Sequence, residues 1–183
     1  MRRQTLINNL FEHSRVQTLG SPFETVNVAD VLDAAKANLV LTLQKKNASI
    51  EHGDLPVVEG DRMQLEQLFQ NLIGNAIKFH GEEAPKVRIE VARQSGEWIF
   101  RVSDNGIGIE AKYLDRIFDV FQRLHTRSEY PGTGIVLAIC QRIVQRHGGR
   151  IWEDSDVGQG ATYSFTIPDR KPATNSTSAA NSA

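Results

Sequence analysis

The chain has 183 residues, 40% of them hydrophobic and 23% charged, and a formal net charge of -1, which excludes strong electrostatic attraction to nucleic acid or anionic membranes. It has no apolar run near the ~20 residues that span a bilayer, no signal peptide, and one cysteine, which excludes a disulfide framework and a multi-cysteine metal site. The length suits one cytoplasmic domain with a buried core and some trailing sequence.

Hydrophobic periodicity and turn residues divide the chain into predicted elements. Residues 1–19 carry apolar side chains at near-helical spacing and stop at Gly20-Ser21-Pro22, which predicts a short amphipathic helix belonging to a longer element. The elements that follow are a strand at 23–28, a helix at 29–46, strands at 48–52 and 56–58, a helix at 61–80, strands at 86–92 and 98–103, a helix at 134–147, and strands at 150–154 and 161–168. The polar, low-complexity tail at 169–183 is predicted to be disordered.

The helix at 61–80 is the most clearly marked element. Asp61 and Gln64 have the spacing of a capping box, and Gly81 is a suitable helix-ending residue. Strands and helices intermix along the chain without regular β-α-β alternation. This order predicts an α+β sandwich with the helices on one face of a mixed, mostly antiparallel sheet.

A polar stripe runs along the same helix, beside its apolar stripe. Asn71, Asn75 and Lys78 are spaced by four and three residues, so their side chains point the same way. Two asparagines in mid-helix need a reason, because asparagine is a mediocre helix former. An asparagine oxygen can ligate Mg²⁺ and a lysine can hold a phosphate. A solvated polar face explains this helix equally well when it is considered alone.

Three glycine-containing segments follow. Asp104 directly follows the predicted strand at 98–103 and precedes Gly106 and Gly108. Its carboxylate can accept a hydrogen bond from an adenine amino group, and the glycines permit a close approach to a ligand or a sharp turn. Gly132-Thr133-Gly134 opens a helix, whose free N–H groups and dipole form an anion site. Gly158-Gln159-Gly160-Ala161-Thr162 introduces the last strand. Each segment taken singly is also explained as a turn or a glycine-rich helix start.

In this order the motifs closely resemble the catalytic domain of histidine kinases, in the wider group of ATPases that includes DNA gyrase and the heat-shock chaperones. The resemblance covers essentially all of residues 21–168 and includes the stretches LFQNLIGNAIKF, RIFDVFQRLH and AICQRIVQRHGGRIW. The segment FQRLHTRSEYPGTGI is most similar to the corresponding segment of kinases attached to phytochrome-type or PAS sensors. The resemblance implies a two-layer α/β sandwich of the Bergerat type, with a lid over ATP between Gly106 and Gly134.

The same resemblance implies ATP and Mg²⁺ as ligands. The residues that match the family's catalytic positions are Asn71, Asn75 and Lys78, with Asn75 as the metal ligand. Besides these three, the residues that match ATP-binding positions are Phe79, Asp104, Gly106, Gly108, Ile109, Arg123, Gly132, Thr133, Gly134, Val136, Leu137 and Thr162. In the family the aspartate reads the adenine with a threonine as its partner, and the aromatic residue after the lysine lies against the ring.

Two residues bear on the type of reaction. Gyrase-like hydrolases carry a glutamate base for water one turn before the metal asparagine, and this chain has Asn71 there, which favours a kinase over an efficient ATPase. The family has the motif GTGxGL where this chain has GTGIVL, so Val136 replaces a glycine that in the family lies against the triphosphate. The sequence therefore allows two interpretations, an active kinase domain and a catalytically weakened, regulatory pseudokinase.

The phosphoacceptor histidine of the family lies on the first helix of a dimerisation hairpin. Residues 1–20 resemble the end of the second helix of that hairpin, and no histidine of this chain has the acceptor's sequence context. We read His147 as an ordinary helix-end residue favoured by the helix dipole. The implied partners are the hairpin and sensor module of a full-length kinase and a response-regulator receiver domain. We expect the fragment to be a monomer and the full-length protein a homodimer.

Overall fold

The computed structural model describes residues 20–114, 116–119 and 134–170. The predictions made for residues 1–19, for Arg123, Gly132 and Thr133, and for residues 171–183 lie outside the described part of the chain. The helices are α2 (Val28–Lys46), α3 (Arg62–Lys78), α4 (Ala111–Leu114) and α5 (Val136–Arg146). The strands are β1 (Glu24–Asn27), β2 (Ser49–His52), β3 (Val57–Gly60), β4 (Lys86–Gln94), β5 (Glu97–Asp104), β6 (Ile151–Asp156) and β7 (Gly160–Pro168).

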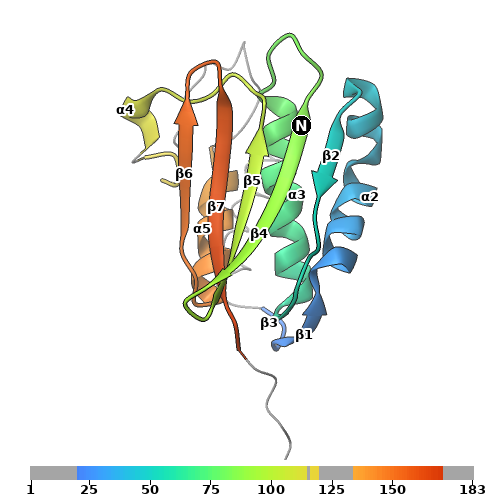
Figure 1. Ribbon diagram of the computed structural model, residues 1–183, viewed down its shortest axis with the longest axis vertical. Helices are drawn as coiled ribbons and strands as arrows, with labels where there is room; N and C mark the ends of the chain where they lie inside the picture. The colour runs from blue at the N-terminus through green and yellow to red at the C-terminus, as the bar shows by residue number, and fades with distance from the viewer. Residues whose placement is uncertain (1–19, 115, 120–133, 171–183) are drawn as a thin grey trace, which may run out of the picture.

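A five-stranded sheet in the order β2-β4-β5-β7-β6 forms one layer, and β1 and β3 form a separate antiparallel pair. The β2-β4 pair is parallel and the other pairs of the large sheet are antiparallel. Figure 1 shows α3 and α5 behind one face of this sheet, with α2 beside α3 at the β2 edge. The predicted α+β sandwich with helices on one face is therefore confirmed. Among the described residues, no helix combines the length and apolarity needed to cross a membrane.

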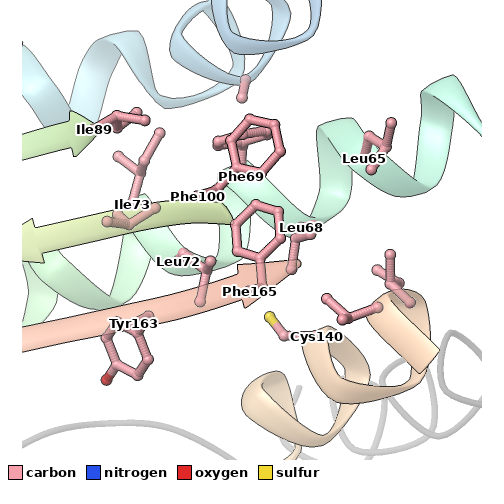
Figure 2. Close-up of a cluster of buried hydrophobic side chains, with 14 of the residues drawn as sticks. Leu65, Leu68, Phe69, Leu72, Ile73, Ile89, Phe100, Cys140, Tyr163 and Phe165 are labelled. Atoms are coloured by element: carbon pink, nitrogen blue, oxygen red, sulfur yellow. The ribbon is translucent and has the colours of Figure 1, made fainter. Parts of the chain in front are cut away.

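The core lies between the sheet and the apolar stripe of α3, which has the predicted helical period. Phe69 of α3 contacts Phe100 of β5 and Phe165 of β7 edge-on, with ring centroids 6.0 and 5.7 Å apart, and the two strand rings stack at 4.9 Å (Figure 2). Burial of each such side chain contributes about 1.5–3 kcal/mol. The buried residues of the helix are Gln64, Leu65, Leu68, Phe69, Leu72, Ile73, Ala76 and Ile77.

The ends of α3 differ from the prediction in two respects. Asp61 caps the helix by accepting a hydrogen bond from the Gln64 amide at 3.2 Å, but Gln64 does not complete a capping box. The Asp61 amide donates instead to Nε2 of His147 at 3.0 Å, and the Gln64 side chain accepts from Arg146 at 2.7 Å. The helix ends with Phe79 as its C-cap and not at Gly81, because the chain after it is held in a bridge to residue 106.

The prediction for His147 was wrong. Its side chain is only 1% exposed and stacks on Phe23 with ring centroids 4.7 Å apart. Since the Asp61 amide can only donate, Nε2 must be an acceptor and Nδ1 must carry the proton that bonds to the Ile143 carbonyl at 2.7 Å. Burial, reinforced by the positive charge of Arg146, lowers the pKa of His147. The residue is thus a neutral part of the interior.

Candidate functional site

The polar stripe of α3 lies against α5. Asn71, Asn75 and Lys78 are half-buried beside the buried stripe. The Asn71 side chain lies beside the thiol of Cys140, whose pKa is raised to about 12, mainly by burial. Cys140 is fully buried and projects from α5 into the core cluster (Figure 2). Asn71 is therefore half-buried against α5.

The contacts between α3 and α5 show that the two helices are antiparallel. The amide of Asp61, at the start of α3, donates to His147 at the end of α5, and Asn71 lies beside Cys140 halfway along. Moving one turn further along α3 and one turn back along α5 brings Asn75 level with Val136. The predicted metal ligand and the first turn of α5 are thereby brought to one end of the domain.

The start of α5 offers free backbone donors. Val136 is its first residue, and within the described part of the chain no side chain caps the helix. The first N–H groups of a helix have no partner inside the helix, so they and the positive end of the dipole attract an anion. Gly134, with a φ of 71°, turns the chain into this helix, while Ile135 is fully buried. The Val136 side chain is half-buried beside these donors, and Leu137 packs against the core.

Asp104 is held at the carboxyl end of β5. Its Oδ1 atom accepts hydrogen bonds from the amides of Gly106 at 2.8 Å and Ala161 at 3.1 Å. Oδ2 accepts no hydrogen bond from the residues that the structure describes, which leaves it available to a ligand. Burial raises the pKa of Asp104, and its two backbone hydrogen bonds oppose that rise.

Thr162 is not brought to Asp104. In the β5-β7 register Ser103 is opposite Thr162, and the two hydroxyl groups are 2.9 Å apart. Because neighbouring residues of a strand point to opposite faces, Asp104 faces the helices and this hydroxyl pair faces away from them. The residue of β7 beside the Asp104 carboxylate is Ala161, which supplies only its amide.

The glycines after Asp104 allow close backbone approach within the protein. A Cβ on Gly106 would lie 2.5 Å from the Phe79 carbonyl oxygen, and one on Gly108 would lie 2.1 Å from that of Asp156. Gly108 also has a φ of 69°, which glycine adopts without strain. The sequence allows two reasons for these glycines, a close approach to a ligand or a sharp turn. Turning and close packing within the protein are sufficient to explain both positions.

The same packing brings the end of α3 to the Asp104 segment. The Ile107 amide donates to the Phe79 carbonyl at 2.9 Å, and the Lys78 ammonium lies 4.2 Å from the centre of the Phe79 ring. Ile109 packs against the core, and its amide donates to Oγ of Ser155 at 2.9 Å, which in turn donates to the Gly160 carbonyl. Ser155 was missed by sequence reasoning, because a serine in a short strand carries no periodic or motif signal.

Residues 60–171 match the sequence profile of a family described as histidine kinase-, DNA gyrase B-, and HSP90-like ATPase. The chain is 52% identical over 165 residues to the cyanobacterial phytochrome A of Nostoc sp., a match covering 90% of this chain and 22% of that protein. It is 47% identical over 165 residues to the phytochrome-like protein Cph1 of Synechocystis sp., again covering 90% of this chain and 22% of the relative. The chain therefore spans less than a quarter of the length of either relative.

Solved structures have the same fold. Full-length ShkA in complex with AMPPNP has a TM-score of 0.74 at 27% identity, covering 90% of this chain and 35% of that one. The nucleotide-free catalytic domain of the histidine kinase ThkA has a TM-score of 0.69 at 27% identity, covering 81% of this chain and 97% of that one.

Proposed function

Because this chain belongs to the family of histidine kinase-, DNA gyrase B- and HSP90-like ATPases, we propose that it binds Mg-ATP and transfers the γ-phosphate to a histidine of a dimerisation hairpin. The observation that carries this proposal is the Asp104 carboxylate. One of its oxygens is held by two backbone amides, and the other accepts no hydrogen bond from the described residues. Such a fixed acceptor suits the amino group of adenine.

The phosphates would lie towards α5. Asp104, the Phe79 end of α3 and the uncapped start of α5 meet at one end of the domain, so a nucleotide held by its base at Asp104 can extend its phosphates towards the free amides at Val136. Lys78, which lies on the same face of α3 as Asn75, would add a positive charge. In this arrangement the main role of the chain is to position the γ-phosphate.

The residues fit Mg²⁺ that is carried by the nucleotide. Among the described residues, no group of three or more His, Cys, Asp or Glu side chains could hold a metal ion. Mg²⁺ readily takes phosphate oxygens and waters as most of its ligands, and the Asn75 carboxamide oxygen would be the protein's contribution. The bound ion would neutralise charge on the phosphates during transfer.

The surroundings of Asn71 favour transfer to a histidine over hydrolysis. Hydrolysis needs a base near the attacking water. Neither the Asn71 amide nor the neighbouring Cys140 thiol, with a pKa of about 12, accepts a proton near neutral pH. An acceptor histidine brings its own nucleophile and needs no such base. This reasoning supports a kinase whose acceptor is supplied from outside residues 21–168.

The relatives support a signalling context. We propose that residues 1–20 continue a dimerisation hairpin, that residues 21–168 are the catalytic domain of a phytochrome-type or PAS-linked sensor kinase, and that a response-regulator receiver domain takes the phosphate onward. Both phytochrome relatives are much longer than this chain, which is consistent with a sensor preceding it. The full-length protein would then be a homodimer in the cytoplasm.

Val136 favours a second candidate function, a nucleotide-binding regulatory module with little kinase activity. Its side chain is half-buried at the first turn of α5, where phosphate oxygens would approach the free amides. The test is phosphotransfer from radiolabelled ATP to a separately produced dimerisation hairpin of the phytochrome-like relative from Synechocystis, alongside calorimetric ATP binding. Binding with transfer supports the kinase, binding without transfer supports the regulatory module, and absence of binding would refute both.

A further inference from the structure

Glu153 of β6 is a buried carboxylate that the proposed nucleotide site does not use. In the β6-β7 register it is opposite Tyr163, so it shares the helix-facing side of the sheet with Tyr163 and Asp104. Both of its carboxylate oxygens are buried, and neither has a hydrogen-bond partner among the described residues. Such a group is unusual, because a buried polar atom without a partner costs about 1–3 kcal/mol.

The surroundings of Glu153 favour its uncharged form. Burial is the main cause that raises the pKa of Glu153 to about 8, followed by the negative charges of Asp104 and Asp154. In the sheet, β7 separates the two carboxyl groups: Asp104 of β5 accepts from the amide of Ala161, and Glu153 of β6 is opposite Tyr163, two residues further along the same strand. At neutral pH Glu153 is therefore mostly a carboxylic acid, with one hydrogen to donate and one oxygen to accept.

The other titratable groups facing Glu153 leave it without a counter-charge. Tyr163 of β7 and Cys140 of α5 are both buried, and burial raises the pKa of each well above its ordinary value, so both stay neutral. On α4, which packs against β6, Lys112 is paired with Glu110 at 2.7 Å. Within the described part of the chain, no basic side chain forms an ion pair with Glu153.

We propose that Glu153 is a specificity-determining residue of the nucleotide site, whose uncharged carboxyl group works beside Asp104 to orient a 6-aminopurine. This inference rests on the nucleotide binding proposed above. Asp104 accepts from the exocyclic amino group, and Glu153 donates to a ring nitrogen, directly or through one bound water. An adjacent acceptor and donor match adenine, which presents an amino donor beside a ring-nitrogen acceptor, and oppose guanine, which presents a carbonyl beside a ring N–H. Ionisation of Glu153 removes the donor and adds a second negative charge beside Asp104.

The test is calorimetric binding of Mg-free ADP and GDP between pH 7 and 9.5 to the parent chain, Glu153→Gln, Glu153→Val and a control, Glu90→Gln. Glu90 is exposed on the open face of β4, so its variant should match the parent. If only the uncharged form binds well, the ADP affinity of the parent falls about tenfold from pH 7 to pH 9, because the uncharged fraction of Glu153 falls from about nine-tenths to about one-tenth over that range. Glu153→Gln, which keeps a donor at every pH, should retain ADP affinity and lose this pH dependence.

Glu153→Val should bind ADP several-fold more weakly at pH 7 and discriminate less against GDP, with a thermal melting temperature at least as high as that of the parent. A purely structural Glu153 would leave the pH profile of ADP binding the same in the parent and in Glu153→Gln, whatever the change in melting temperature. A parent that binds ADP with the same pH profile as Glu153→Gln would overturn the role of Glu153 alone. A parent that binds no adenine nucleotide at any pH would overturn this proposal and the proposed function together.

Discussion

Acidification should destabilise the domain through His147, and the structure allows the size of the effect to be worked out. The neutral ring accepts from the Asp61 amide at 3.0 Å and donates to the Ile143 carbonyl at 2.7 Å. A second proton on Nε2 would point a donor at a donor, which loses one buried hydrogen bond and leaves an amide unpaired, at a cost of about 1–3 kcal/mol. Burial also lowers the pKa of His147 in the folded state, because the protein interior disfavours the charged ring.

The sign follows from proton linkage. The unfolded chain takes up a proton on His147 near pH 6.5, whereas the folded chain takes it up only at lower pH. The unfolded state therefore binds more protons in that window, so the free energy of unfolding is at its full value above pH 6.5 and declines as the pH falls. The decline is at most about 1.4 kcal/mol per pH unit and stops below the folded-state pKa.

The assay is urea unfolding at intervals from pH 7.5 to 4.5 for the parent, His147→Gln and the control His52→Gln. His52 is exposed, so its variant should follow the parent at every pH. His147→Gln should be less stable than the parent at neutral pH, because it loses the ring that stacks on Phe23. A glutamine can accept from the Asp61 amide and does not titrate, so the free energy of unfolding of this variant should fall less steeply as the pH is lowered. The difference in unfolding free energy between parent and His147→Gln should shrink below pH 6.5. A difference that stays constant over the whole range would refute the neutral, buried assignment of His147.

Three further variants test the site. Asp104→Asn keeps an acceptor for the two backbone amides but can turn a donor towards the purine, so ATP affinity measured by calorimetry should fall by about 1–3 kcal/mol; unchanged affinity would remove Asp104 from the base site. Asn75→Ala should abolish the Mg²⁺ dependence of nucleotide affinity and leave the thermal melt unchanged, because the side chain lies outside the core stripe of α3; a mutant with the metal dependence of the parent would contradict the assignment. Val136→Gly should tighten ATP binding modestly and raise phosphotransfer to an added hairpin by a larger factor, since a misplacement of about 1 Å can cost on the order of a hundredfold in rate; if neither constant changes, the side chain does not meet the phosphates.

Local features of the sequence were sufficient to predict most of the fold. The period of the apolar stripe in residues 61–80 predicts α3 and the side that it buries, and alternation in 86–92 and 98–103 predicts the β4-β5 hairpin. The order of the asparagine-containing helix and the three glycine-containing segments was sufficient to identify the family. These signals succeed because each depends on residues within one or two turns of each other, whose spacing is dictated by backbone geometry.

Contacts between residues far apart in the sequence determined the charge states and side-chain directions that the sequence did not predict. His147 is neutral because it is buried and because its Nε2 accepts from the Asp61 amide, 86 residues away. Nothing in the sequence around His147 indicates that partner. The face taken by Thr162 depends on the β5-β7 register, since a shift by one residue would turn its side chain towards Asp104. The sequence gives Glu153 the appearance of an ordinary polar strand residue, and only the assembled fold buries its carboxylate oxygens and raises its pKa. Burial, register and charge state are properties of the assembled layers, so they come from the tertiary structure and not from the pattern along the chain.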